Sequence, residues 1–223
     1  FHIPFEDRHK VATQRYSLPG VPCLYLACSL YTCWVEMGCP PLHELQVAAF
    51  RLRDNQTIRI VNFSAKPKLF HESIHHRGLP DKTSVEVCAN QIILWPLMAL
   101  CAIIVKHRNA PFKPEYTVPQ LLLQWIRKQV DFSGVCYFST RDNAVIRWPP
   151  LKLANFVFPA KEFRAEGRCA FLRQLFEMTA PVSWELLSAT NLGEKLRDEG
   201  IPLVVEMIPG IPEDYYVTEF GRS

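Results

Sequence analysis

Several familiar function signals are missing from the sequence. It contains no Walker loop, no G-x-G-x-x-G and no G-x-S-x-G motif. These absences argue against a P-loop NTPase, a Rossmann-type dehydrogenase and an α/β-hydrolase. It also has no long basic run, and its formal net charge is only +3. A charge excess this small does not predict nucleic acid as a partner.

Long apolar runs are absent as well. The most apolar window, residues 91–105, is shorter than the roughly 20 residues that cross a bilayer, and it contains Pro96. We therefore expect a buried core helix there and no membrane contact. The chain opens at Phe1 without a methionine or a signal-peptide pattern, which leaves open that upstream residues have been trimmed.

Neither C-x-x-C pairs nor common zinc spacings occur among the 8 cysteines. Most of the cysteines have apolar neighbours, which is typical of reduced, packed thiols and predicts a cytoplasmic protein without disulfides. His71 and His75 have the spacing of a helical metal site, but they lie in a polar stretch with no third ligand. We interpret them as surface residues and expect no metal.

The composition is that of a folded protein, with 48% hydrophobic and 21% charged residues in a chain of 223. We expect a single domain over residues 1–223, with the motif-bearing core at about 11–160 and C-terminal helices and a strand at 161–223. Predicted strands come first, helices follow, and strands return. This order favours an α+β fold with a mixed or antiparallel split sheet flanked by helices.

Local patterns predict where the elements lie. Helices are expected at residues 30–37, 90–106, 118–130, 163–178 and 184–199, and strands at 23–27, 45–52, 57–63, 134–139, 153–158 and 201–208. Ser29 is the expected cap of the first helix. The strands 45–52 and 57–63 are expected to pair around a turn at 53–56, and 70–83 is expected to be a loop.

One stretch raises a functional question. Residues 14–36, QRYSLPGVPCLYLACSLYTCWVE, place Arg15 before a turn, Tyr25 on a strand and Glu36 on the last turn of a helix. Three adjacent elements could converge on one cleft. The plainer interpretation, which the local pattern by itself favours, is a solvated arginine, a core tyrosine and a surface glutamate.

This stretch resembles the first half of the RES domain family, which is named for its arginine, glutamate and serine. The resemblance rests on the pattern RYSxxGxPxxYLxxS from Arg15, followed by Glu36. The segment GVCYFSTRD at 134–142 is similar to the family's strand that ends in serine, and LANFVFP at 153–159 to its asparagine-bearing strand. Together the matches cover about residues 15–159 in order.

The resemblance implies a fold like that of ADP-ribosyltransferases and an enzyme that attacks NAD⁺ at the bond between ribose and nicotinamide. It also implies a toxin that a partner antitoxin with a helix-turn-helix domain neutralises. NAD⁺ would be a substrate rather than a cofactor, and inorganic phosphate is left open as a co-substrate. The sequence leaves open whether the chain forms a homo-oligomer.

Residue by residue, the family's arginine, tyrosine, glutamate, serine and asparagine correspond to Arg15, Tyr25, Glu36, Ser139 and Asn155. A carboxylate such as Glu36 can stabilise an oxocarbenium-like ribose and activate water or phosphate. The guanidinium of Arg15 suits a diphosphate, and the ring of Tyr25 can stack on nicotinamide. Ser139, which with Glu36 and Arg15 makes up the predicted catalytic set, is expected to hydrogen-bond the carboxamide or ribose, and Asn155 to orient Ser139 or Glu36.

Two further residues complete the predicted NAD-binding set, Tyr16 within the first motif and Arg141 after the serine. Arg141 could contact phosphate or be an ordinary loop charge. The segment between Glu36 and Ser139 is longer than in compact family members, which predicts an insertion around 70–83.

Two other functions remain open from the sequence. One is an ADP-ribosyltransferase that modifies a macromolecule. The other is a non-catalytic interaction module that keeps the fold and binds a partner through the insertion and a basic patch. The patch is equally well explained as a solvated sheet edge, and its members are Arg51, Arg53, Arg59, Lys66 and Lys68.

Overall fold

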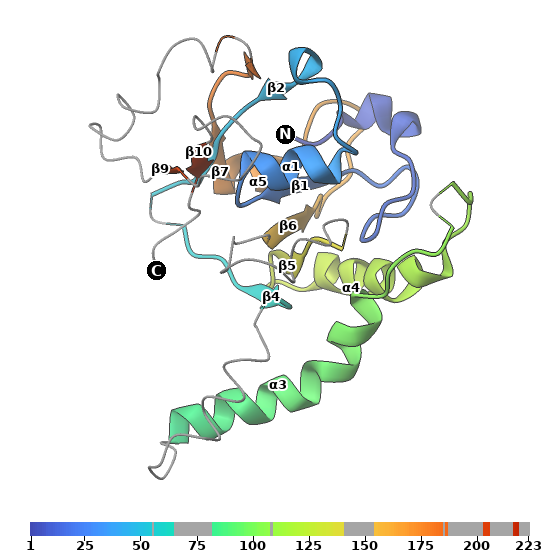
Figure 1. Cartoon of the computed structure of the whole chain (residues 1–223), viewed down its shortest axis with the longest axis vertical. Helices are drawn as coiled ribbons and strands as arrows, with labels where there is room; N and C mark the ends of the chain where they lie inside the picture. The colour runs from blue at the N-terminus through green and yellow to red at the C-terminus, as the bar shows by residue number, and fades with distance from the viewer. Residues whose placement is uncertain are drawn as a thin grey trace.

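A four-stranded sheet lies at the centre of the computed structural model (Figure 1). The structure describes residues 1–54, 56–64, 82–107, 109–140, 154–184, 186, 203–205 and 216–218. The strand order is β1-β6-β5-β4, with bounds β1 Cys23–Ala27, β6 Ala154–Pro159, β5 Gly134–Phe138 and β4 Ile60–Asn62. β6 is antiparallel to both β1 and β5, whereas β4 runs parallel to β5. With the helices described below, this mixed sheet confirms the α+β prediction.

Helices flank the central sheet. Helix α4, Thr117–Lys128, contacts β5 and β6 and buries Leu123 and Ile126 completely. Helix α3, Lys82–Cys101, contacts α4 and η3 near its C-terminal end and extends away from the sheet (Figure 1). Helix α1, Leu30–Glu36, lies against β1. Short helices complete the set: η1 Phe5–Lys10, η2 Leu42–Glu44, η3 Pro114–Tyr116 and α5 Ala170–Leu175.

Both faces of the central sheet carry a core. Because side chains alternate along a strand, Val157 and Phe158 of β6 belong to two different clusters. Val157 packs among the residues of α4, and Phe158 packs against Phe176, with ring centroids 4.8 Å apart. The sheet is therefore packed on both faces, and the residues at its edges and strand ends are the ones that can reach the surface.

The predicted hairpin of 45–52 with 57–63 is wrong. The first region forms two short strands, β2 Gln46–Val47 and β3 Phe50–Leu52, which pair with β8 Val182–Ser183 and β7 Phe176–Met178. Only β4 joins the central sheet. Phe50 and Leu52 pack in the cluster of Phe158 and Phe176, so burial of these side chains outweighs the local turn signal. A further pair, β9 Leu203–Val205 with β10 Tyr216–Thr218, falls partly in the predicted strand 201–208.

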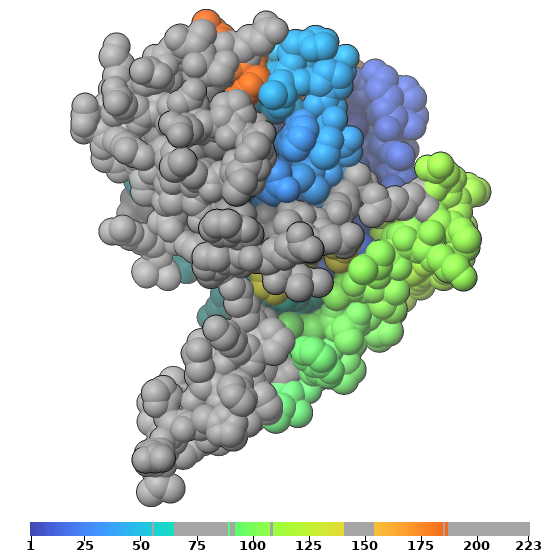
Figure 2. Space-filling model, in the orientation of Figure 1, coloured from blue at the N-terminus to red at the C-terminus, as the bar shows by residue number. Residues whose placement is uncertain are grey.

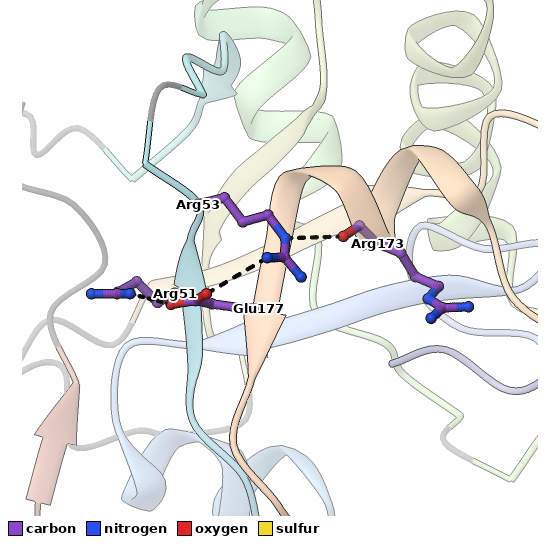
Figure 3. A network of polar contacts seen from close by, with 4 residues as sticks. All are labelled: Arg51, Arg53, Arg173 and Glu177. Carbon is purple, nitrogen blue, oxygen red and sulfur yellow. Dashed lines mark hydrogen bonds and ion pairs between the residues drawn. The ribbon is translucent and has the colours of Figure 1, made fainter.

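The expected basic patch is partly neutralised. Glu177 on β7 pairs with Arg51 and, at 3.7 Å, with Arg53, whose Nε also donates to the carbonyl of Arg173 at 3.2 Å (Figure 3). Arg59 lies 3.9 Å from Asp131. Lys66 and Lys68 fall outside the described residues. These pairs are exposed and contribute at most about 1 kcal/mol each, so the described part of the patch behaves as the solvated sheet edge.

The helix predictions have mixed outcomes. Ser29 caps α1 as expected, accepting a hydrogen bond from the Thr32 amide at 3.1 Å. The helix predicted at 163–178 is confirmed only at α5, since the chain continues directly into β7. The predicted helix at 184–199 lies largely outside the described residues, as does most of the loop at 70–83, whose last two residues begin α3.

The expectation of a buried core helix at 91–105 is wrong. Helix α3 covers the first part of this window, yet Ile93 is 73% and Trp95 56% exposed. Only Leu97, Met98 and Cys101 pack against the core. Apolar composition alone could not show that the helix extends past the body of the protein. Among the described residues, no helix is long and apolar enough to cross a membrane.

We predict that Gly134→Ala destabilises the fold by about 1–3 kcal/mol, because β5 and β6 approach closely at this position. An added Cβ would lie 2.4 Å from the Val157 carbonyl oxygen and 2.7 Å from the Phe158 ring. The carbonyl belongs to a paired strand and cannot move aside. The free energy of unfolding in urea measures the effect.

Gly20→Ala is the control for this prediction. Gly20 has a φ of +74° but open space around its Cβ position, so only the backbone preference, about 1 kcal/mol, should be lost. An equal or smaller loss for Gly134→Ala would contradict the steric explanation.

Candidate active site

A cleft of about 530 Å³ opens where the central sheet meets α1 and the connection from α3 to α4. Its volume is within the range of small-molecule and cofactor pockets. Among the residues that line it are four that the sequence singled out, namely Arg15, Tyr25, Glu36 and Asn155. The structure therefore brings these four residues to one cleft, which for Arg15, Tyr25 and Glu36 is the alternative that the sequence had left open.

Strand register explains one wall of the cleft. Ala27 of β1 is paired with Asn155 of β6, and Asn155 is paired with Tyr137 of β5. Paired residues on neighbouring strands project to the same face of a sheet, so these three side chains form a row across three strands. All three line the cleft.

Glu36 is held at the cleft by Asn155. Its helix is positioned by the Ser29 cap at one end, and Glu36 lies in the last turn at the other. The Asn155 amide donates to Glu36 Oε1 at 2.7 Å. Asn155 is 3% exposed, so the bond anchors one carboxylate oxygen from the sheet. Carboxylate and amide thus belong to different elements but form one unit.

Arg15 is fixed by three hydrogen bonds. Its Nη1 donates to the carbonyls of Cys101 and Ile103, both at 2.9 Å, and its Nη2 donates to Thr140 Oγ1 at 2.6 Å. A guanidinium has five N–H donors. Within the described part of the chain, the Nε–H and one Nη2–H have no partner, and two donors are what bidentate recognition of a phosphate or carboxylate requires.

Aromatic and cationic groups surround Arg15. The guanidinium carbon lies 5.3 Å from the ring centroid of Tyr116. The ammonium of Lys113 lies 5.8 Å from the same ring and donates to the Ala110 carbonyl at 2.8 Å. Lys113 and Tyr116 both line the cleft. One part of the cleft is therefore positively charged, and the carboxylate of Glu36 belongs to the same cavity.

Tyr25 presents its ring to the cleft and keeps its hydroxyl inside the protein. The hydroxyl is 2.9 Å from Ser17 Oγ. Burial raises the pKa of Tyr25 above its ordinary value, so the side chain is neutral in the physiological range. A neutral, anchored aromatic ring is suited to contact with a flat ligand and not to acid–base chemistry.

Two of the predicted residues, Tyr16 and Ser139, are not among the residues that line the cleft. Tyr16 is fully buried behind it, with its ring centroid 4.6 Å from that of Tyr137. Ser139 is 5% exposed, and its neighbour Thr140 lines the cleft in its place. Tyr16 and Ser139 are thus placed to support the wall rather than to face the cavity. Arg141 lies outside the described residues.

The lining residues that the sequence did not single out include Lys113, Tyr116, Tyr137 and Thr140. Lys113 and Tyr116 lie in and beside the short helix η3, far along the chain from Arg15, and no local pattern marks them. Thr140 directly follows Ser139, so the predicted strand 134–139 already indicated this part of the chain. Within the described residues no group of three or more metal-ligating side chains occurs, and His71 and His75 lie outside them.

The similarity of the chain to known proteins is broad but coarse. No family model and no solved structure matches it. The chain is 33% identical, along its whole length, to a Bacillus subtilis (strain 168) protein named "Putative toxin YopC". It spans about half the length of that relative. The chain is therefore similar to one half of a protein that carries a toxin name.

Proposed function

We propose that the chain is a toxin of the RES domain family that consumes NAD⁺ by cleaving its nicotinamide–ribose bond. The observation that carries the proposal is the meeting of Arg15, Tyr25, Glu36 and Asn155 in one cleft. These residues are four of the five that correspond to the family's motif, and the fifth, Ser139, lies next to the lining residue Thr140. The similarity of this whole chain to one half of a protein with a toxin name supports the assignment as a toxin.

The proposed chemistry assigns each group one task. The bond from ribose C1′ to nicotinamide breaks, and its electron pair leaves with the neutral nicotinamide. The carboxylate of Glu36, oriented by Asn155, stabilises the positive charge that develops on the ribose. An oxygen of water or phosphate then bonds to C1′, and with water the released proton passes to Glu36.

Binding is assigned to the other part of the cleft. The two remaining donors of Arg15 bind the diphosphate, and Lys113 adds a second positive charge. Tyr25 or Tyr137 offers an aromatic face to the nicotinamide. Ser139 acts indirectly, by fixing the end of β5 next to Thr140. As in other members of the proposed family, a helix-turn-helix antitoxin in the cytoplasm is the expected partner.

A time course of NAD⁺ with the purified protein, followed by NMR with and without phosphate, tests the proposal. We expect release of nicotinamide, together with ADP-ribose for hydrolysis or ADP-ribose 1-phosphate for phosphorolysis. Label transferred to a protein would support ADP-ribosylation of a macromolecule instead. Binding of NAD⁺ without any consumption would contradict catalysis and support an interaction module.

We predict that Cys33 takes no part in this chemistry even though it lines the cleft. Burial raises the pKa of its thiol to about 11, so almost no nucleophilic thiolate exists near neutral pH. Cys33→Ser should change the rate of NAD⁺ consumption by no more than about 3-fold, since a protonated thiol is a poor nucleophile. A large loss, measured in the same NMR assay with unchanged thermal stability, would assign the thiol a role.

A further inference from the structure

Helix α3 presents an apolar surface that the described part of the fold leaves exposed. Seven large side chains in residues 92–104 are between 37% and 73% exposed: Ile92, Ile93, Leu94, Trp95, Leu100, Ile103 and Ile104. No charged residue occurs between Gln91 and Val105. Figure 2 shows the described part of α3 in green on the lower right side of the molecule, continuous with α4.

The contacts of α3 explain why this surface stays open. Leu97, Met98 and Cys101 join the core cluster that includes Leu123 and Ile126 of α4. They attach only the C-terminal half of the helix, and the exposed residues 92–95 precede them along the helix axis. On α4, Leu121 and Trp125 are also 65% and 48% exposed. A helix that is apolar on all sides is normally buried on all sides.

We propose that α3 is a dimerisation helix that packs against α3 of a second copy of this chain. The exposed apolar area of the seven side chains amounts to several hundred Å², which is comparable with the roughly 800 Å² per partner of a stable interface. It also exceeds scattered surface exposure on a monomer. This inference goes beyond the proposed function and does not depend on it.

The uncharged character of the surface favours a second copy as the occupant. In a two-fold dimer the same patch faces itself, so any charge near the axis would meet its own like charge. Residues 92–104 contain none. A bilayer surface is a different occupant, and binding to vesicles is a separate outcome of the test below.

Sedimentation equilibrium of the 223-residue chain tests the proposal, with Ile93→Glu as the disrupting variant. We expect the parent to be a dimer in the micromolar range. Ile93→Glu should weaken the dimer by at least about 100-fold, because an unpaired carboxylate would be buried against the apolar partner helix. Since Ile93 is 73% exposed, circular dichroism should show an unchanged fold.

Ile3→Glu is the matched control. Ile3 is 40% exposed and lies two residues from the N-terminus, which Figure 1 marks on the other side of the central strands from α3, so this variant should remain dimeric. A monomeric parent would overturn the proposal. So would dissociation of both variants, an Ile93→Glu dimer as tight as the parent, or a monomer that co-sediments with phosphatidylcholine–phosphatidylglycerol vesicles.

Discussion

Glu36→Gln is expected to lower the rate constant of NAD⁺ consumption by about 10³-fold, the scale of a lost general base or charge-stabilising carboxylate. The substitution removes the negative charge and keeps the shape. A glutamine carbonyl can still accept the hydrogen bond that Asn155 donates to Glu36 Oε1 at 2.7 Å. The variant should therefore fold and bind NAD⁺ like the parent while failing to release nicotinamide.

The controls separate the charge of Glu36 from its position. Glu44→Gln, the same change in an exposed side chain on η2, should have no effect. Asn155→Ala removes the anchor but leaves the carboxylate, so we expect a smaller loss of about 10-fold, the effect of one misplaced but intact catalytic group. If Glu36→Gln consumed NAD⁺ as fast as the parent, the proposed mechanism would be wrong, whatever the product.

The segment from Arg15 to Glu36 was the most predictable part of the molecule. The strand Cys23–Ala27 and the helix that begins after Ser29 follow from local signals, namely a turn, a β-rich run and a capping serine. Their meeting at a cleft was only one of two alternatives, because adjacent elements can pack together without forming a site. The bond from Asn155 to Glu36 was not predictable in detail, because it depends on the register of β1 with β6.

Elements with no local partner were predicted poorly. The turn after β3 resembles that of a hairpin, yet β3 pairs with β7 and β4 with β5, so long-range pairing decides the topology. Helix α3 has the apolar composition of a core helix, and its exposure depends on how far α4 carries it from the sheet. For the same reason Lys113 and Tyr116 could not be assigned to the cleft from sequence.

Arg15→Lys is expected to raise the KM for NAD⁺ by about 10- to 100-fold and to change kcat little, since each hydrogen bond to a charged group is worth about 1.5–3 kcal/mol. Lysine keeps the positive charge but has no planar fork. In the parent, three donors hold the carbonyls of Cys101 and Ile103 and the hydroxyl of Thr140, and two remain for the diphosphate. An ammonium has only three donors in all, so it cannot serve the protein and the substrate together.

The thermal stability of Arg15→Lys distinguishes anchoring from binding. Loss of the tether to Cys101 and Ile103 should lower Tm by a few degrees, because two carbonyls at the end of α3 lose their partner. Arg53→Lys is the matched control, since Arg53 is also hydrogen-bonded to a backbone carbonyl but lies on the exposed β3 edge. It should leave KM unchanged. An Arg15→Lys variant with a lower Tm and a normal KM would show that Arg15 has a structural role only. The proposal that it binds the diphosphate would then be wrong.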